Sequence, residues 1–86
     1  MAYILRHKES LEIYATTFKN NYDLPFYGVL FWEDEDLAVS EAADFLNDGW
    51  ELISVPEAKH KVINVKLNND PSNRVTLDQD GRVSKV

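Results

Sequence analysis

The sequence predicts one α+β domain in which a single amphipathic helix packs on a mainly antiparallel β-sheet. A helical pattern spans about residues 35–48, and apolar runs at 26–32 and 50–55 flank it. Short segments rich in β-formers, bounded by turn residues, account for most of the remaining chain. The expected order is therefore β-β-β-α-β-β followed by a C-terminal β-hairpin.

The predicted helix has one apolar side when its residues are placed at 100° intervals. Glu33, Asp34, Glu35 and Asp36 stand at its start. There, carboxylates accept bonds from the free N–H groups of the first turn and oppose the helix dipole, so Asp34 or Asp36 is the expected N-cap. The apolar arc consists of Ala38, Val39, Ala42, Ala43, Phe45 and Leu46.

Gly49 marks the end of this helix, because glycine adopts the left-handed conformation that a helix C-terminus favours. Trp50 then occupies the position from which an apolar side chain contacts the last turn, here at Phe45. The chain is expected to continue as a strand over 50–55 and to turn at 56–58.

Residues 3–7 and 11–18 predict two strands joined by a tight connection at residues 8–10. Apolar Leu11, Ile13 and Ala15 alternate with more polar neighbours, as on a half-buried strand. The apolar residues also have helical spacing over 9–19, so a helix is the alternative. The pair of threonines and the β-branched neighbours favour the strand.

Residues 19–25 predict a loop, because an Asn pair favours turns and Pro25 keeps Leu24 out of the helical region. The following run, 26–32, is apolar without alternation. Such a run belongs in the middle of a sheet, or on a sheet whose second face meets a partner. Gly28 within it predicts a bulge or the close approach of another backbone.

Residues 61–67 predict a strand with Ile63, Val65 and Leu67 facing inward. Residues 68–73 form a loop by composition. Residues 74–78 and 82–85 predict a hairpin about Gly81 in the left-handed conformation. Neither strand of this hairpin is strongly apolar, so 74–85 is expected at the periphery of the domain.

The chain of 86 residues corresponds to one domain, 1–86, with a modest core. Hydrophobic residues make up 44% of it, which excludes a disordered chain. No apolar run approaches the roughly 20 residues that span a bilayer, and the N-terminus does not resemble a signal peptide, so no membrane partner is expected. The absence of cysteine excludes disulfides and thiolate metal sites, and the expected location is cytoplasmic.

The net charge of −6 is unevenly distributed. Residues 20–58 contain ten acidic residues and no lysine or arginine, whereas residues 1–19 carry +1 and residues 59–86 carry +3. This asymmetry argues against a broad phosphate-binding surface on the helix. A small basic patch on the terminal strands, with Lys61, Lys66, Arg74 and Arg82, is compatible with it.

Residues 45–55, Phe-Leu-Asn-Asp-Gly-Trp-Glu-Leu-Ile-Ser-Val, resemble the helix-to-strand junction of a family of short bacterial and phage domains of unknown function. Members typically show a Leu-Asn pair, a glycine and then Gly-Trp-Glu-Leu-Val-Ser. This chain lacks the residue or two that many members carry before Gly-Trp. The resemblance implies a helix that leads into a strand and a bacterial, phage or mobile-element source, and it implies no activity.

Few residues suggest chemistry. Residues 33–36 would suit a divalent cation, but a helix N-terminus explains them without a metal. The segment 78–81 is similar to a calcium loop, but the chain ends before the closing glutamate and a turn remains. His7 and His60 lie far apart in sequence, so a zinc site is not expected. Without a phosphate loop, a nucleophile elbow or a metalloprotease motif, we expect no enzyme, no cofactor and no metal.

The aromatic residues near the central strands exceed what one sheet face beneath one helix covers, so we expect an exposed aromatic patch. The hypothesis is a non-enzymatic protein-interaction module. It would bind itself or a host protein through this sheet face or an open strand edge, while the acidic helix orients the encounter. The candidate partner-binding residues are Tyr22, Phe26, Tyr27, Trp32, Glu33, Asp34, Glu35 and Asp36.

Two alternatives stay open. The first is a role with nucleic acid: the acidic stretch from Glu33 to Glu51 imitates phosphate and occupies a DNA-binding protein, or the basic terminal strands bind nucleic acid weakly. The second is a small enzyme with paired carboxylates, which requires a pocket with two converging ionisable groups.

Overall fold

The computed structural model describes residues 1–86 and contains seven strands and three helices. All strand pairs are antiparallel, and the mixture of helices and antiparallel sheets confirms the α+β class. None of the helices has the length and apolar composition that crossing a bilayer requires. The elements are β1 (Ala2–His7), β2 (Ala15–Lys19), β3 (Pro25–Val29), β4 (Phe31–Trp32), α1 (Glu35–Glu41), α2 (Ala43–Leu46), β5 (Trp50–Val55), α3 (Glu57–Leu67), β6 (Val75–Leu77) and β7 (Val83–Lys85).

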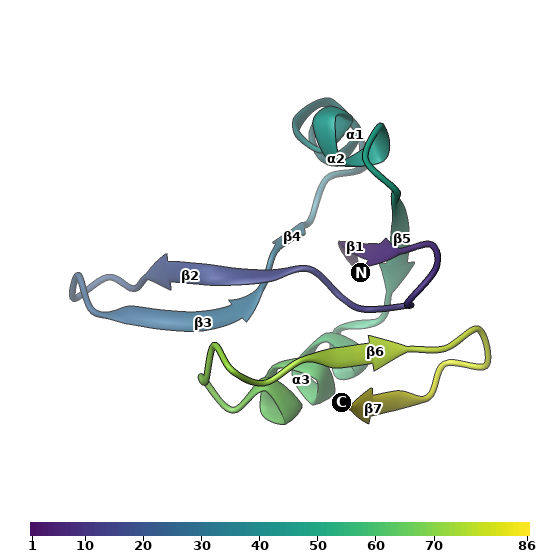
Figure 1. The fold of residues 1–86 in the computed structure, drawn as a ribbon. Coiled ribbons are helices and arrows are strands. Elements are labelled where there is room, and N and C mark those ends of the chain that lie inside the picture. Colours follow the sequence, from purple (N-terminus) through teal and green to yellow (C-terminus); the bar gives the residue numbers. More distant parts are fainter.

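The strands form one three-stranded sheet and two hairpins (Figure 1). β1 is the central strand of the three-stranded sheet, between β4 and β5. β2 pairs with β3, and β6 pairs with β7. The segment between β1 and β2 connects the sheets, since Ile13 bridges to Arg6 of β1 and Glu12 bridges to Thr76 of β6. The segment between β1 and β2 therefore links the three-stranded sheet to the β6–β7 hairpin.

Alternate residues of β1 belong to two hydrophobic cores. Ile4 lies in a core that α3 covers, whereas Leu5 lies in a core that α1 covers. Figure 1 shows α3 and the α1–α2 pair on opposite sides of the three-stranded sheet. Both faces of this sheet are thus buried. The α3 core consists of Ala2, Ile4, Ile13, Val29, Val55, Ile63, Leu67, Val75 and Leu77, and the α1–α2 core of Leu5, Trp32, Ala38 and Ala42.

The predicted helix over 35–48 is not a single helix, because it divides at Ala42. This residue has φ −87° and ψ 1°, which separates α1 from α2. Helical bonding nevertheless crosses the division: the Ala42 N–H donates to the Ala38 oxygen at 2.8 Å, and the Leu46 N–H donates to the Ala42 oxygen at 3.0 Å. The predicted N-cap is confirmed at Asp34, whose carboxylate accepts from the Leu37 N–H at 2.9 Å.

Gly49 has φ +89°, which confirms the left-handed residue predicted after the helix. A Cβ at this position would lie 3.2 Å from Nε2 of His7. We expect Gly49→Ala to lower the free energy of unfolding by about 1–2 kcal/mol through left-handed strain, with a further loss from displacing the His7 ring. Chemical denaturation measures the change. Gly81→Ala is the matched control, since Gly81 has φ +87° but its Cβ would meet only Nζ of Lys59 at 3.9 Å. A loss no larger than that of Gly81→Ala would contradict the His7 contact.

The predicted hairpin between residues 3–7 and 11–18 forms only next to its turn. The His7 N–H donates to the Glu12 oxygen at 2.8 Å, the Tyr14 N–H donates to the Leu5 oxygen at 2.9 Å, and Ile13 bridges to Arg6. From Ala15 onward the chain leaves β1 and pairs with β3 as β2. The reason is that Tyr3 and Ile4 of β1 already pair with β4 on that side, so β2 cannot continue along β1. The helix alternative is wrong. Tyr14, just before β2, packs edge-on against both Phe45 and Trp50, with ring centroids 4.8 and 5.3 Å away. The Tyr14 ring thus bridges the two residues that the sequence predicts to be in contact with each other.

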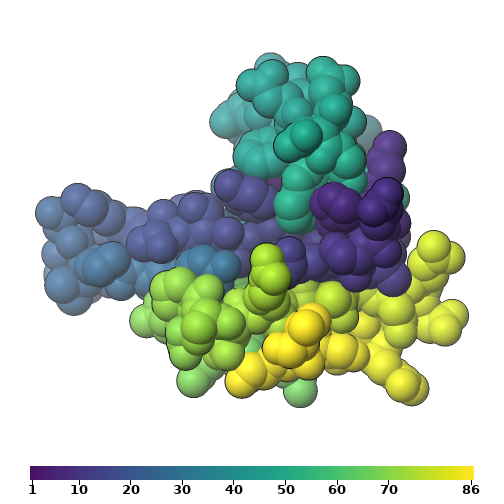
Figure 2. Space-filling model, in the orientation of Figure 1, coloured from purple at the N-terminus to yellow at the C-terminus, as the bar shows by residue number.

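The apolar run 26–32 forms two short strands, β3 and β4, rather than one. Leu30 separates them, and Val29 enters the α3 core while Trp32 enters the α1–α2 core. Apolar and polar residues do not alternate in this run because it contributes side chains to both cores. Gly28 allows the close approach of a side chain, since a Cβ there would lie 3.1 Å from Oδ1 of Asn64. Figure 2 shows the β2–β3 hairpin projecting from the body of the domain.

Residues 57–67 form helix α3, so the predicted strand over 61–67 is wrong. Ile63 and Leu67 are buried four residues apart, whereas Val65, predicted to face inward, is 73% exposed. Alternating β-branched residues imitate a strand here, but the buried pair has helical spacing. Pro56 precedes the helix at the N-cap, and Asn68, with φ +52°, ends it in the left-handed conformation.

The predicted C-terminal hairpin is confirmed, with Gly81 at φ +87° in its turn. The Asp78 carboxylate accepts from the Arg82 N–H at 2.8 Å and so closes the turn. The hairpin is not peripheral, however, because Val75 and Leu77 are 1% and 4% exposed. Two inward residues suffice to anchor a strand whose other positions are polar.

Candidate functional site

The predicted aromatic patch does not exist as one surface. Trp32 is only 9% exposed, in the α1–α2 core. Tyr22 lies in the turn of the β2–β3 hairpin and is 83% exposed, while Phe26 stacks on Phe18 with ring centroids 5.3 Å apart. Tyr27 packs partly buried against the α3 core. Trp32 is buried because the three-stranded sheet has two covered faces instead of one, whereas Tyr22 and Phe26 stay exposed on the β2–β3 hairpin.

The acidic residues at the start of α1 have separate roles. Asp34 caps the helix, and Glu33 and Asp36 are exposed. No group of three or more histidine, aspartate or glutamate side chains converges as metal ligands anywhere in the structure. Glu35 lines a groove beside β5, and it is the one predicted partner-binding residue that does so.

The outer edge of β5 is an unpaired strand edge. β5 stands at the end of the order β4-β1-β5 and pairs only with β1. Natural edge strands usually carry lysine, proline or a bulge that discourages pairing with other chains. β5 contains neither lysine nor proline, and its register with β1 is continuous. Its one charged residue, Glu51, is bound by Nε of Arg6 at 3.1 Å. The edge is thus open to main-chain pairing.

The hydrogen bonds between β1 and β5 determine which backbone groups of β5 point outward. The Lys8 N–H donates to the Gly49 oxygen at 2.9 Å, so these two residues form a hydrogen-bonded pair. Such pairs alternate with non-hydrogen-bonded pairs along an antiparallel ladder. The N–H and C=O groups of Trp50, Leu52 and Ser54 therefore point away from β1. No other backbone segment binds them.

The edges of the hairpins are protected. On β3, the Val29 N–H donates to Oδ1 of Asn64 at 2.9 Å, and the Tyr27 N–H donates to Oδ1 of Asn69. On β6, the preceding segment 11–13 supplies backbone partners. β2 ends in an exposed lysine, and β4 and β7 have only two and three residues. β5 is therefore the longest edge without cover.

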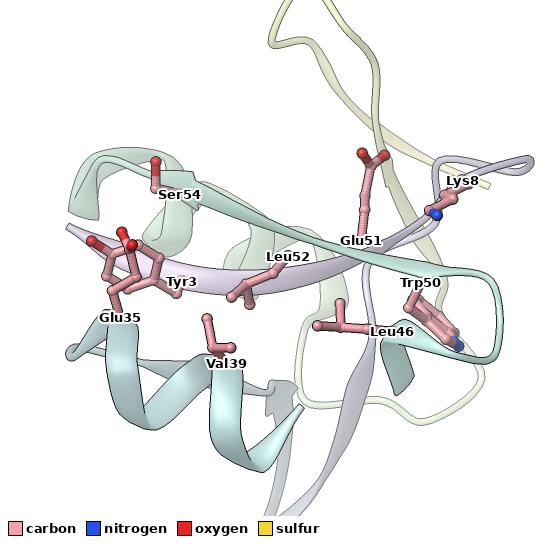
Figure 3. A pocket seen from close by; sticks show the side chains of 9 residues that line it. All are labelled: Tyr3, Lys8, Glu35, Val39, Leu46, Trp50, Glu51, Leu52 and Ser54. Atoms are coloured by element: carbon pink, nitrogen blue, oxygen red, sulfur yellow. The ribbon is translucent and has the colours of Figure 1, made fainter. Parts of the chain in front are cut away.

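A groove of about 510 Å³ runs along this edge, between β5 and the α1–α2 pair (Figure 3). We call it the β5 groove. Val39, Leu46 and Leu52 form its apolar middle. Val39 belongs to the apolar arc of the helix, yet it is 49% exposed because no element of the domain covers it. An apolar side chain from another molecule would find contacts here.

The two ends of the β5 groove differ in charge (Figure 3). Glu35 lies beside Tyr3 and Ser54 at one end, and Lys8 lies near Trp50 at the other. Partial burial and the negative charge of Glu35 raise the pKa of the Tyr3 hydroxyl. None of the ion pairs in the structure involves Glu35. Its carboxylate is available to a cation.

A second cavity, of about 270 Å³, contains Glu12, Tyr27 and Arg74. Nε of Arg74 lies 2.8 Å from Oε1 of Glu12. Burial and the charge of Glu12 raise the pKa of Tyr27, which Arg74 partly opposes. Arg74 and Glu12 thus form an ion pair at this cavity. Lys61 and Lys66, predicted on a basic strand, lie on α3 instead.

The two histidines contact different aromatic rings. His7 packs edge-on against Trp50 with ring centroids 5.2 Å apart, and its Nδ1 accepts from the Glu9 N–H at 3.2 Å. His60 lies against Phe31 with ring centroids 4.4 Å apart. Nε2 of His60 is buried and has no hydrogen-bond partner. The site around His60 therefore suits the neutral imidazole.

The stability of the protein is expected to decrease as the pH falls through the titration of His60. Burial lowers the pKa of His60 below its ordinary value of 6.5, although Glu57 partly opposes this. The unfolded chain then binds more protons than the folded one, so the free energy of unfolding decreases from about pH 7.5 to pH 5.5. Urea denaturation at both pH values measures it. His60→Phe should show a smaller decrease, and an equal decrease would exclude His60 as the cause.

The β5 groove contains residues whose role sequence reasoning missed. The helical pattern predicts Val39 and Leu46 as core, and the strand pattern of 50–55 does not reveal an open edge, because strand order is not encoded locally. The chain leaves α2 through Gly49 and continues directly into β5. Comparison with protein-family models, curated proteins and solved structures finds no match to this chain.

Proposed function

We propose that this protein is a non-enzymatic interaction module that receives an extended segment of a partner protein as an additional strand on the outer edge of β5. The observation that supports this proposal is the unpaired six-residue edge, without lysine or proline, along a groove with an apolar middle. In strand addition, main-chain hydrogen bonds provide affinity and alternate side chains provide specificity.

The edge and the groove act together in this proposal. Trp50, Leu52 and Ser54 offer outward N–H and C=O groups, and each main-chain bond contributes about 0.5–1.5 kcal/mol net. Hydrogen bonds of this kind do not discriminate between sequences. The exposed Val39 and the neighbouring Leu46 and Leu52 supply apolar contacts for side chains that the added strand places over the groove.

Ser54→Pro tests the proposal with little disturbance of the fold. Ser54 is exposed, and its N–H points outward rather than to β1. Proline at an edge position therefore removes a donor that only a partner uses, and it remains compatible with extended backbone. Ser54→Ala is the matched control, because it removes the hydroxyl and keeps the N–H.

Peptides selected from a displayed random library provide the ligands for this test. We expect the selected peptides to bind Ser54→Ala as they bind the original protein. They should bind Ser54→Pro about tenfold more weakly, since a bond of about 1 kcal/mol is lost and the ring obstructs approach. Peptide-induced shifts of the backbone amides of Trp50, Leu52 and Ser54 locate the contact. Equal binding to both variants, or a library without binders, would overturn strand addition.

A further inference from the structure

We propose that the segment added to β5 is cationic, with a lysine or arginine opposite Ser54 and an apolar residue opposite Leu52. This inference rests on the strand addition proposed above and specifies the chemistry of the partner. In the favoured antiparallel orientation the segment reads cation, any residue, apolar residue. Three features of the edge support it: the alternation of the strand, the apolar middle of the β5 groove, and the Glu35 carboxylate at one end of the groove, which forms no ion pair.

Alternation determines where the side chains of the added strand lie. In an antiparallel pair, residues directly opposite each other project to the same face. Trp50 and Leu52 pack against the α1–α2 core, so Ser54, two residues further along, faces the same side. Side chains opposite these residues extend over the β5 groove. Side chains opposite Glu51 and Ile53 extend over the other face of the sheet.

The residue opposite Leu52 meets the apolar middle of the groove. Leu52 and Leu46 are partly buried, and Val39 is 49% exposed across from them on α1. Figure 3 shows these three side chains facing one another between the helix and the strand. A branched apolar side chain placed there covers part of the Val39 surface that the domain itself leaves in water, and this burial of apolar surface favours binding.

A long cationic side chain opposite Ser54 extends over the end of the β5 groove that Glu35 lines. This carboxylate lies beside Tyr3, the strand neighbour of Ser54, and takes part in none of the ion pairs of the structure. The surrounding chain strengthens the preference for a cation, because residues 20–58 contain ten acidic residues and no lysine or arginine. Lys8, the one cation that lines the groove, lies at the opposite end.

A second copy of this chain is disfavoured by the same charges. Pairing β5 with β5 of another copy would place the two α1–α2 pairs on one side of a continuous sheet. Each copy carries −6 overall, and its acidic residues concentrate in the segment that forms the groove. Like charges at such short range oppose association, whereas a cationic segment of a different protein is attracted.

The experiment uses three capped hexapeptides that differ at one position. The Lys peptide is Thr-Lys-Thr-Val-Thr-Val, and the Gln and Glu peptides carry glutamine or glutamate in place of lysine. The second residue lies opposite Ser54 and the fourth opposite Leu52. Each peptide is titrated into the full-length protein, and the affinity is measured from shifts of the backbone amides of β5. We expect the Lys peptide to bind between about twofold and tenfold more tightly than the Glu peptide, with the Gln peptide between them.

Protein variants identify the carboxylate that is responsible. Glu35→Gln should remove most of the difference between the peptides, and Glu35→Lys should reverse it so that the Glu peptide binds more tightly. Glu41→Lys is the matched control, because it makes the same change of charge on an exposed residue of α1 that does not line the groove. We expect it to preserve the order of the three peptides.

The backbone of the peptide separates failure of this inference from failure of strand addition. N-methylation of the fourth residue blocks an N–H that faces β5, whereas N-methylation of the third residue blocks one that faces away. If the three peptides bind equally and only the first modification abolishes binding, the charge preference is overturned and strand addition stands. If no peptide binds, if both modifications have the same effect, or if light scattering shows a dimer that Ser54→Pro dissociates, strand addition of a partner segment is overturned as well.

Discussion

Trp32→Ala is expected to lower the free energy of unfolding by about 3–5 kcal/mol, the range for truncation of a large buried aromatic residue. Trp32 is 9% exposed and packs with Leu5, Ala38 and Ala42, so it joins β4 and β1 to the helix above them. Small domains have a total stability of roughly 5–15 kcal/mol, so this loss is a large fraction. Urea denaturation followed by circular dichroism measures the change.

Two further variants make this result decisive. Tyr22→Ala, at a position that is 83% exposed, should change the free energy of unfolding by less than about 0.5 kcal/mol. Trp32→Phe keeps a ring in the core, so its loss remains measurable if the alanine variant does not fold. Similar small losses for Trp32→Phe, Trp32→Ala and Tyr22→Ala would mean that Trp32 lies on the surface, as the sequence hypothesis of an aromatic patch requires.

The elements that the sequence predicts well depend on local signals. The N-cap at Asp34, the left-handed Gly49 and the turn at Gly81 each follow from one residue type at one position. The strands over 50–55 and near the N-terminus follow from short runs of β-formers. Such features require no knowledge of what packs against them, because backbone conformation and capping decide them within a few residues.

The features that the sequence misses depend on partners far along the chain. The sequence places Trp32 in an exposed patch, because it does not show that α1 covers this residue. It places Val39 in the core, because it does not show the groove beside β5. The unpaired edge of β5 follows from the strand order, which places β1 between β4 and β5. Of the eight predicted partner-binding residues, Glu35 alone lines the groove, and it does so because α1 runs alongside β5.

Ile63→Ala is expected to lower the free energy of unfolding by about 2–5 kcal/mol, the usual range for removing a buried aliphatic side chain. Ile63 is fully buried on α3 and packs in the largest hydrophobic core. The variant tests the element that the sequence pattern misrepresents. In a strand, Ile63, Val65 and Leu67 would share the inward face, whereas in helix α3 only the first and last of them do.

Val65→Ala separates the two interpretations, because this residue is 73% exposed on the helix but would be buried in the strand. We expect a change within about 0.5 kcal/mol for Val65→Ala. The same helix also anchors the β3 edge, since Asn64 lies between these residues and accepts from the Val29 N–H. Equal, large losses for Ile63→Ala and Val65→Ala would restore the strand. They would also remove the cover from β3, and β5 would then no longer be the single long edge open to a partner.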